Sequence, residues 1–73
     1  MLSVFSRASC QPCYQLKKYL THKGIDFKEF DVDIDENLNK MLKLTGKMIV
    51  PTVVRGDQII VGLNYGALAK MLY

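Results

Sequence analysis

Two cysteines, Cys10 and Cys13, lie two residues apart and are the side chains of this chain best suited by type and spacing to chemistry. Two thiols at this separation can close a small disulfide and open it again when they lie at the start of a helix. There the unpaired backbone N–H groups and the positive end of the helix macrodipole stabilise a thiolate. We therefore expect Cys10 to attack a substrate disulfide and Cys13, one turn further in, to resolve the mixed disulfide.

The neighbours of the pair have roles of their own. Pro12 suits the first turn of a helix, where its missing N–H would have had no partner, and its fixed φ should hold the two sulfurs at a constant distance. Arg7 has two interpretations, either a solvated loop charge or a contact to the thiolate or the substrate. Tyr14 either flanks the pair or packs as an amphipathic side chain.

Metal binding is the main alternative for a Cys-x-x-Cys spacing. Structural zinc sites normally take four protein ligands, whereas this chain offers two cysteines and one histidine, His22. His22 lies late in an expected helix, where an imidazole is favourable as an ordinary surface residue. We expect no metal site. A non-catalytic metal- or partner-binding module stays the alternative function class, and an inert pair in a reducing cytosol is a third option.

The composition is that of an ordinary globular domain. The chain has 73 residues, of which 49% are hydrophobic and 23% are charged, so we expect a single domain over residues 1–73. Its formal net charge is +3. The lysines at positions 17, 18 and 23 are followed by a series of acidic residues between Asp26 and Glu36, so the basic residues form no stripe. We therefore expect no nucleic-acid partner.

The beginning of the chain has no basic n-region and no apolar stretch long enough for a signal peptide. No apolar stretch elsewhere approaches the roughly 20 residues that span a bilayer. These features predict a cytoplasmic protein without membrane contact. Thiols are kept reduced in the cytoplasm, where a close cysteine pair is more often catalytic or metal-binding than a structural crosslink.

The elements expected around the pair begin with a strand and a helix. Residues 2–5 suit a short buried strand that leads into the cysteine loop. Cys13, Leu16 and Leu20 then recur at helical spacing and predict one buried helical face. Gly24 marks the end of this helix.

Residues 25–33 predict a second strand with a disturbed pattern. Apolar and polar residues alternate in both halves, but the phase slips at residues 28–29. The slip predicts either a bulge at that point or a core strand limited to the second half, around Phe30 and Val32.

A second helix follows this strand. Asp33 and Glu36 are spaced like a capping box, and Gly46 marks the end of the helix. The apolar or small residues at helical spacing between them are Ile34, Leu38, Met41, Leu42 and Thr45.

The last part of the chain predicts a hairpin and a third helix. Residues 48–54 and 58–61 are β-rich and flank a turn, with Pro51 at the beginning or edge of its strand. Asn64 is a candidate cap for the last helix. The shared face expected there consists of Tyr65, Leu68, Ala69 and Leu72. The order βαβαββα predicts an α/β domain with one mixed sheet covered by helices.

This arrangement resembles the thioredoxin fold in its smallest form, and specifically the glutaredoxin family. The resemblance covers nearly the whole chain. Its features are the first strand, the Cys-x-x-Cys at a helix start, the Gly24 break, the acidic stretch 30–33, Val50-Pro51 before a strand and Gly62 before the last helix. It implies a minimal glutaredoxin fold with a four-stranded mixed sheet flanked by helices, and thiol-disulfide oxidoreductase activity. Within the family, residues 5–10 and 23–27 resemble the NrdH-type redoxins, which reduce ribonucleotide reductase and are themselves reduced by thioredoxin reductase.

The resemblance also implies roles for individual residues. Cys10 would be the nucleophile and Cys13 the resolving thiol of a redox-active disulfide, with no bound cofactor. Pro51 would be a cis-proline beside them, and Val50 would present backbone groups to the substrate chain. The remaining candidate substrate contacts are Arg7, Gln11, Pro12, Gly62 and Leu63.

Two departures from the family pattern concern the partners. Gln11-Pro12 stands where glutaredoxins usually have Pro-Tyr, and Gly62 is followed by Leu63, Asn64 and Tyr65 instead of glycine and an acidic residue. The missing charged contacts argue against strong glutathione binding. The NrdH-type pattern is also incomplete, because its Trp-Ser-Gly-Phe stretch would fall on residues 60–63. We expect a monomeric electron carrier that reduces a protein disulfide, with ribonucleotide reductase as a candidate target in deoxyribonucleotide synthesis. Its reductant is either thioredoxin reductase with NADPH or glutathione.

Overall fold

The structure is a computed structural model that describes residues 2–72. Within these residues the element order is the predicted βαβαββα. The elements are β1 (Leu2–Ser6), α1 (Gln11–His22), β2 (Phe27–Asp31), α2 (Asp35–Thr45), β3 (Thr52–Arg55), β4 (Gln58–Val61) and α3 (Tyr65–Leu72). The strands form one sheet in the order β2-β1-β3-β4, in which β1 and β2 are parallel and the other neighbours are antiparallel. The prediction of a four-stranded mixed sheet is confirmed.

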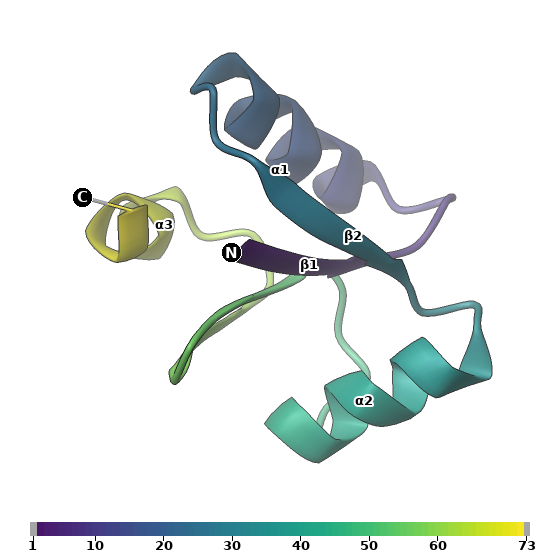
Figure 1. Cartoon of the computed structure of the whole chain (residues 1–73). Coiled ribbons are helices and arrows are strands. Elements are labelled where there is room, and N and C mark those ends of the chain that lie inside the picture. Colours follow the sequence, from purple (N-terminus) through teal and green to yellow (C-terminus); the bar gives the residue numbers. More distant parts are fainter. Residues whose placement is uncertain (1, 73) are drawn as a thin grey trace.

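The helices cover both faces of this sheet. Figure 1 shows α1 and α3 on one side and α2 on the other. Two buried clusters separate in the same way. The first joins the sheet to α1 and α3 through Leu2, Val4, Leu16, Leu20, Val53, Leu68 and Met71. The second joins it to α2 through Phe5, Val32 and Met41, with Phe30, Leu38, Val50 and Val54 packed against them.

Strand β2 explains the disturbed apolar pattern, and both expected alternatives are wrong. Its pairing with β1 is regular from Leu2 opposite Phe27 to Ser6 opposite Asp31, so no bulge is present between these residues. Phe27 packs on the α1 side, whereas Phe30 stacks on Phe5 on the α2 side, with 5.0 Å between the ring centroids. Because successive strand residues point to opposite faces, a strand with both faces covered carries apolar residues in both phases.

Helix α1 begins and ends close to the predicted positions. Cys10 is its N-cap, and Pro12 lies in its first turn. At the other end Gly24 adopts φ +70°, and the Ile25 N–H donates to the Leu20 carbonyl at 3.0 Å. This is a Schellman ending, which requires a left-handed residue just past the helix. The chain thereby turns from α1 directly into β2.

The capping box predicted for α2 is wrong. Its N-cap is Ile34, whose side chain makes no capping hydrogen bond. The Asp33 carboxylate turns away to Arg7, and the Asp33 N–H donates to the Asp31 carboxylate at 2.9 Å. Asp35 and Glu36 lie in the first turn of the helix, where negative charge suits the macrodipole without a side-chain cap.

The last segments match the prediction in outline. Strand β3 begins at Thr52, directly after buried Pro51, so the proline lies before the ladder as expected. Asn64 caps α3, since its side-chain oxygen accepts from the Ala67 N–H at 3.0 Å. The face predicted for α3 needs correction. Leu68 and Met71 are its buried residues, and Tyr65 is exposed because it lies in the first turn, at the edge of the core.

Candidate active site

Four chain segments meet at one end of the sheet. Strand β1 ends at Ser6, and the Val32 N–H after β2 donates to the Ser6 carbonyl at 2.9 Å. Because β3 runs antiparallel to β1 with Thr52 opposite Phe5, Pro51 lies at the same end as Ser6. The Gly62 N–H donates to the Pro51 carbonyl at 2.7 Å, which brings the residues after β4 to this end as well. The loop that delivers Cys10 leaves from here.

The cysteine pair occupies the N-terminus of α1. Cys10 and Cys13 form a disulfide with 5.2 Å between their Cα atoms. Cys10 has an extended backbone, and its sulfur accepts a hydrogen bond from the Cys13 N–H at 3.2 Å. Cys13 is completely buried against the sheet, whereas Cys10 is partly accessible. No acidic residue lies in the first turn, so the N–H groups at this helix end favour negative charge on the Cys10 sulfur.

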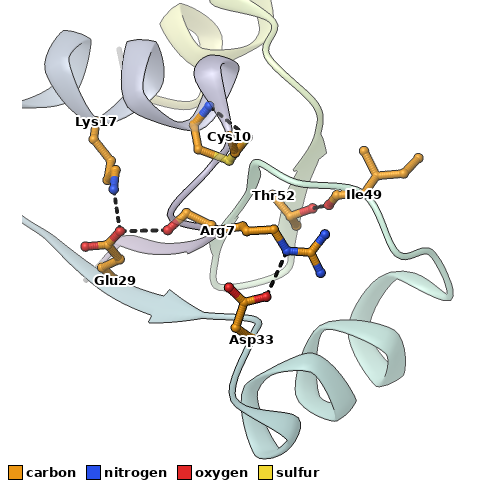
Figure 2. The surroundings of a disulfide bond; sticks show 9 residues. Arg7, Cys10, Lys17, Glu29, Asp33, Ile49 and Thr52 are labelled. Atoms are coloured by element: carbon orange, nitrogen blue, oxygen red, sulfur yellow. Dashed lines mark hydrogen bonds and ion pairs between the residues drawn. A yellow bond between two sulfur atoms is a disulfide. The ribbon is translucent and has the colours of Figure 1, made fainter.

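Arg7 pairs with a carboxylate. Its Nε donates to Asp33 Oδ1 at 3.0 Å, and Figure 2 shows the guanidinium turned toward Asp33. Asp33 follows β2, so the pair ties the cysteine loop to the segment before α2. The structure gives Arg7 a carboxylate partner that sequence spacing did not indicate, and its role as a substrate contact stays a prediction.

A second polar group lies on the α1 side of the sheet. Glu29 on β2 accepts from Lys17 Nζ at 2.6 Å and from the hydroxyl of buried Ser6 at 2.7 Å, both through the same carboxylate oxygen (Figure 2). The hydrogen bond from Lys17, followed by that from Ser6, holds the pKa of Glu29 below its ordinary value, while burial opposes this effect. The position of Lys17 on the expected helix did not indicate this contact. The available signal was Glu29 itself, a charge at the point where the strand pattern slips.

The accessible side of Cys10 opens into a shallow pocket of about 390 Å³. Its lining residues are Ala8, Ser9, Cys10, Gln11 and Tyr14. Tyr14 therefore flanks the pair, with 55% of its surface exposed. Gln11 and Pro12 are also exposed, so a substrate that reaches the Cys10 sulfur meets these side chains.

The segment before β3 carries the predicted substrate-binding backbone. The Val50–Pro51 peptide bond is cis, as the family resemblance implied. The Val50 side chain packs against the α2-side cluster, while Met48 and Ile49 are exposed. The Thr52 hydroxyl donates to the Ile49 carbonyl at 2.7 Å and fixes the bend of the chain. Sequence reasoning assigned Met48 and Ile49 to a strand and missed this exposed apolar pair.

The two remaining predicted contacts differ from each other. Gly62 is tied to Pro51 and has φ +85°, a backbone conformation that favours glycine. Leu63 packs its side chain against the α1-side cluster. Gly62 is therefore next to the cis-proline, whereas the Leu63 side chain is directed to the core.

The described residues also bear on metal binding and on membrane contact. Within residues 2–72, His, Cys, Asp and Glu form no group of three or more that could hold a metal ion. No helix in that same part of the chain is long and apolar enough to cross a membrane.

Comparisons with known proteins agree with this geometry. The family model described as Glutaredoxin matches residues 2–60. An uncharacterized glutaredoxin-like 8.6 kDa protein in the rubredoxin operon of Clostridium pasteurianum is 32% identical over 73 residues, covering 99% of this chain and 97% of that protein. The glutaredoxin-like protein NrdH of Lactococcus lactis subsp. cremoris is 29% identical over 72 residues, covering 97% and 99%.

A solved structure gives the same result at the level of the fold. The glutaredoxin from Archaeoglobus fulgidus superposes with a TM-score of 0.87 at 25% identity, covering 97% of this chain and 84% of its own. The four-stranded mixed sheet is thus the thioredoxin-like one that the sequence predicted. The chain belongs to the glutaredoxin family of thiol-disulfide oxidoreductases and is similar to the NrdH-type proteins within it.

Proposed function

We propose that this protein is a small dithiol electron carrier that reduces disulfides in other proteins, with Cys10 as nucleophile and Cys13 as resolving thiol. The observation that carries the proposal is the asymmetry of the pair. The Cys10 sulfur is accessible at a helix N-terminus, and the Cys13 sulfur is bonded to it and buried behind it. A substrate can therefore reach one sulfur and not the other.

The exchange proceeds in two balanced steps. The Cys10 thiolate attacks one sulfur of the substrate disulfide, that S–S bond breaks, and the released substrate thiolate takes a proton from water. The Cys13 thiol then loses its proton and attacks the Cys10 sulfur of the mixed disulfide. The second substrate sulfur leaves and is protonated, and two electrons have passed from the dithiol to the substrate. The helix N-terminus stabilises the Cys10 thiolate each time it is the attacking or leaving group.

The substrate chain is expected to lie along the end of the sheet that holds Val50 and Pro51 and from which the Cys10 loop leaves. Met48 and Ile49 supply exposed apolar surface on one side, and Gln11 and Tyr14 line the other. Gly62, hydrogen-bonded to the Pro51 carbonyl, holds the cis-proline segment in place. Arg7 is held by Asp33 at the rim. Ribonucleotide reductase is the target proposed on the basis of the NrdH-type relatives. We also propose that the protein is a monomer and that it acts in the cytoplasm.

Thioredoxin reductase is the proposed source of electrons. The residues after Gly62 offer no acidic side chain for the amine of glutathione, and their own side chains are occupied. Leu63 packs on the core, Asn64 caps α3, and the Tyr65 ring lies 5.0 Å from that of Tyr19. Because these three side chains already have contacts within the protein, they support a protein as reductant over glutathione.

NADPH consumption tests both parts of the proposal. The oxidised protein is supplied either with thioredoxin reductase or with glutathione plus glutathione reductase, and insulin serves as the disulfide substrate. We expect turnover with thioredoxin reductase and little with glutathione. Turnover with glutathione alone would contradict the proposed reductant, and the absence of insulin reduction by chemically reduced protein would contradict the proposed activity itself.

A further inference from the structure

The outward side of α1 carries a surface that begins at Tyr14, beside the Cys10 pocket, and extends beyond the residues that the proposed exchange uses. We call it the basic face of α1 and define it by Tyr14, Lys18, Tyr19, His22 and Lys23. Two shallow hollows of about 590 and 280 Å³ lie on it and share Lys18 and His22. Among the described residues that line these hollows, none is acidic.

The lysines of this face lie close to aromatic rings. Lys18 Nζ lies 6.0 Å from the centroid of the Tyr14 ring, and Lys23 Nζ lies 5.7 Å from that of Tyr19. Lys17, their neighbour on the helix, is engaged by Glu29 instead. Within residues 2–72, no carboxylate pairs with Lys18 or Lys23, so their charges are available to a ligand from outside.

The aromatic residues extend this surface from α1 to the start of α3. Tyr65 at the start of α3 packs against Tyr19 and is 46% exposed, and Tyr14 is 55% exposed. Tyrosine is enriched at protein interfaces, where its ring supplies apolar contact area and its hydroxyl can form a hydrogen bond.

The basic face is continuous with the reactive cysteine. Tyr14 lines both the pocket beside Cys10 and the larger hollow on α1. Tyr14 and Lys23 are nine residues apart, which corresponds to roughly 13 Å along a helix. A protein docked with its disulfide at Cys10 can therefore extend over this face along α1.

We propose that the basic face of α1 binds an acidic segment of the protein whose disulfide exchanges with Cys10. The proposal rests on the proposed function and adds the chemical class of its partner. Lys18 and Lys23 supply the positive charge, and Asp26, which lines the next hollow beyond the end of α1, marks where that positive region stops. Two free lysines beside a disulfide suit a short stretch of Asp or Glu better than the phosphates of a nucleic acid, which require a longer basic stripe.

Synthetic peptides test this directly. Two peptides carry the same intramolecular disulfide loop and a two-glycine spacer, followed by four glutamates in one and four glutamines in the other. Four extended residues span about 13 Å, which matches the length of the basic face. At low ionic strength we expect reduced protein to act on the glutamate peptide with a kcat/KM ~10-fold above that for the glutamine peptide, because complementary charge raises the rate of encounter. High salt should remove most of this difference.

Paired charge reversals supply the control. The variant with Lys18→Glu and Lys23→Glu should lose the preference for the glutamate peptide and keep the wild-type rate with the glutamine peptide. The matched variant, with Lys43→Glu and Lys70→Glu on exposed positions of α2 and α3, changes the net charge equally and should keep the preference.

The outcomes separate the two proposals. Equal rates on both peptides with wild-type protein, or an equal loss of preference in both double variants, would overturn the acidic partner and leave the proposed function standing. Failure of wild-type protein to reduce either peptide would overturn the proposed function, and this inference with it.

Discussion

Cys10 and Cys13 differ in exposure, and this difference predicts different phenotypes for their serine variants. Cys10→Ser removes the only accessible sulfur of the pair, so disulfide reduction should fall to background. Cys13→Ser keeps the attacking thiolate but cannot resolve the mixed disulfide, so a covalent adduct with the substrate should accumulate. Mass spectrometry of the reaction with a disulfide peptide measures this adduct. An adduct at Cys13 in the Cys10→Ser variant would reverse the assignment.

Glu29 makes a pH-dependent contribution to stability. Lys17 and Ser6 lower its folded-state pKa, so the contribution is fully present above the ordinary pKa of glutamate and is lost as the pH falls through the lowered value. Glu29→Gln keeps an acceptor for Ser6 but loses the ion pair. Since the Glu29 side chain is 44% exposed, we expect the free energy of unfolding at pH 7 to fall by less than ~1 kcal/mol.

Urea unfolding of Glu29→Gln and the wild-type protein at a series of pH values checks this expectation. The difference between the two proteins should shrink as the pH is lowered below 4.5, the ordinary pKa of a glutamate side chain. Lys43→Gln, on an exposed lysine of α2 without an ion pair among the described residues, is the control and should show no such trend. A difference that grows on acidification would contradict the assigned direction of the pKa shift.

At the scale of the elements, glycine is required at the end of α2 and not inside α3. Gly46 has φ +71°, and a Cβ added there would meet no atom within 4 Å, so Gly46→Ala introduces only backbone strain. We expect a loss of about 1 kcal/mol. Gly66 has ordinary helical geometry, and its added Cβ would lie 3.5 Å from Asn64 Oδ1 in normal contact. Gly66→Ala should therefore stabilise the protein by about 0.5 kcal/mol.

The two alanine variants serve as controls for each other in urea unfolding, with unchanged m-values. If the urea midpoints of Gly46→Ala and Gly66→Ala shifted in the same direction, the backbone conformation of each glycine would not explain the change in stability. The α1 ending follows the same rule, because the Schellman hydrogen bond at Gly24 sets the direction in which β2 begins.

At the scale of the whole molecule, the sheet has a separate buried cluster on each face. Leu20 belongs to the α1-side cluster and Met41 to the α2-side cluster, and both are almost completely buried. Leu20→Ala and Met41→Ala should each lower the free energy of unfolding by about 2–5 kcal/mol, because each leaves a cavity. Leu44→Ala, on an exposed position of α2, should change it by less than ~0.5 kcal/mol. Urea unfolding of the three variants measures this. A negligible effect of Met41→Ala would show that the α2 layer is not part of the cooperative core.

The active site is also a property of the whole molecule. Its parts come from the ends of β1, β2 and β4 and from the residues before β3. They meet because these three strands end, and β3 begins, at the same end of the sheet. Two backbone hydrogen bonds lie there, one from Val32 to Ser6 and one from Gly62 to Pro51. The loop that leads to the reactive helix therefore leaves from a hydrogen-bonded end of the sheet.

Local chemistry made much of this predictable. The Cys-x-x-Cys spacing, Pro12 in the first turn, Gly24 and Gly46 at helix ends, and the Asn64 cap all act within a few residues of chain, so the sequence by itself determined them. The element order followed from apolar periodicity for the same reason.

Tertiary structure decided what depends on contacts between distant segments. The pairing of Arg7 with Asp33 removed the expected capping box, and the Lys17–Glu29–Ser6 group joined three elements. Because both faces of the sheet are buried, β2 carries apolar residues on both of its faces. The sequence of one strand does not show whether its second face is covered. The basic face of α1 likewise depends on where Tyr65 meets Tyr19. Sequence determined which residues can react and where helices end. Packing of distant segments determined which charges are paired and which remain free for a partner.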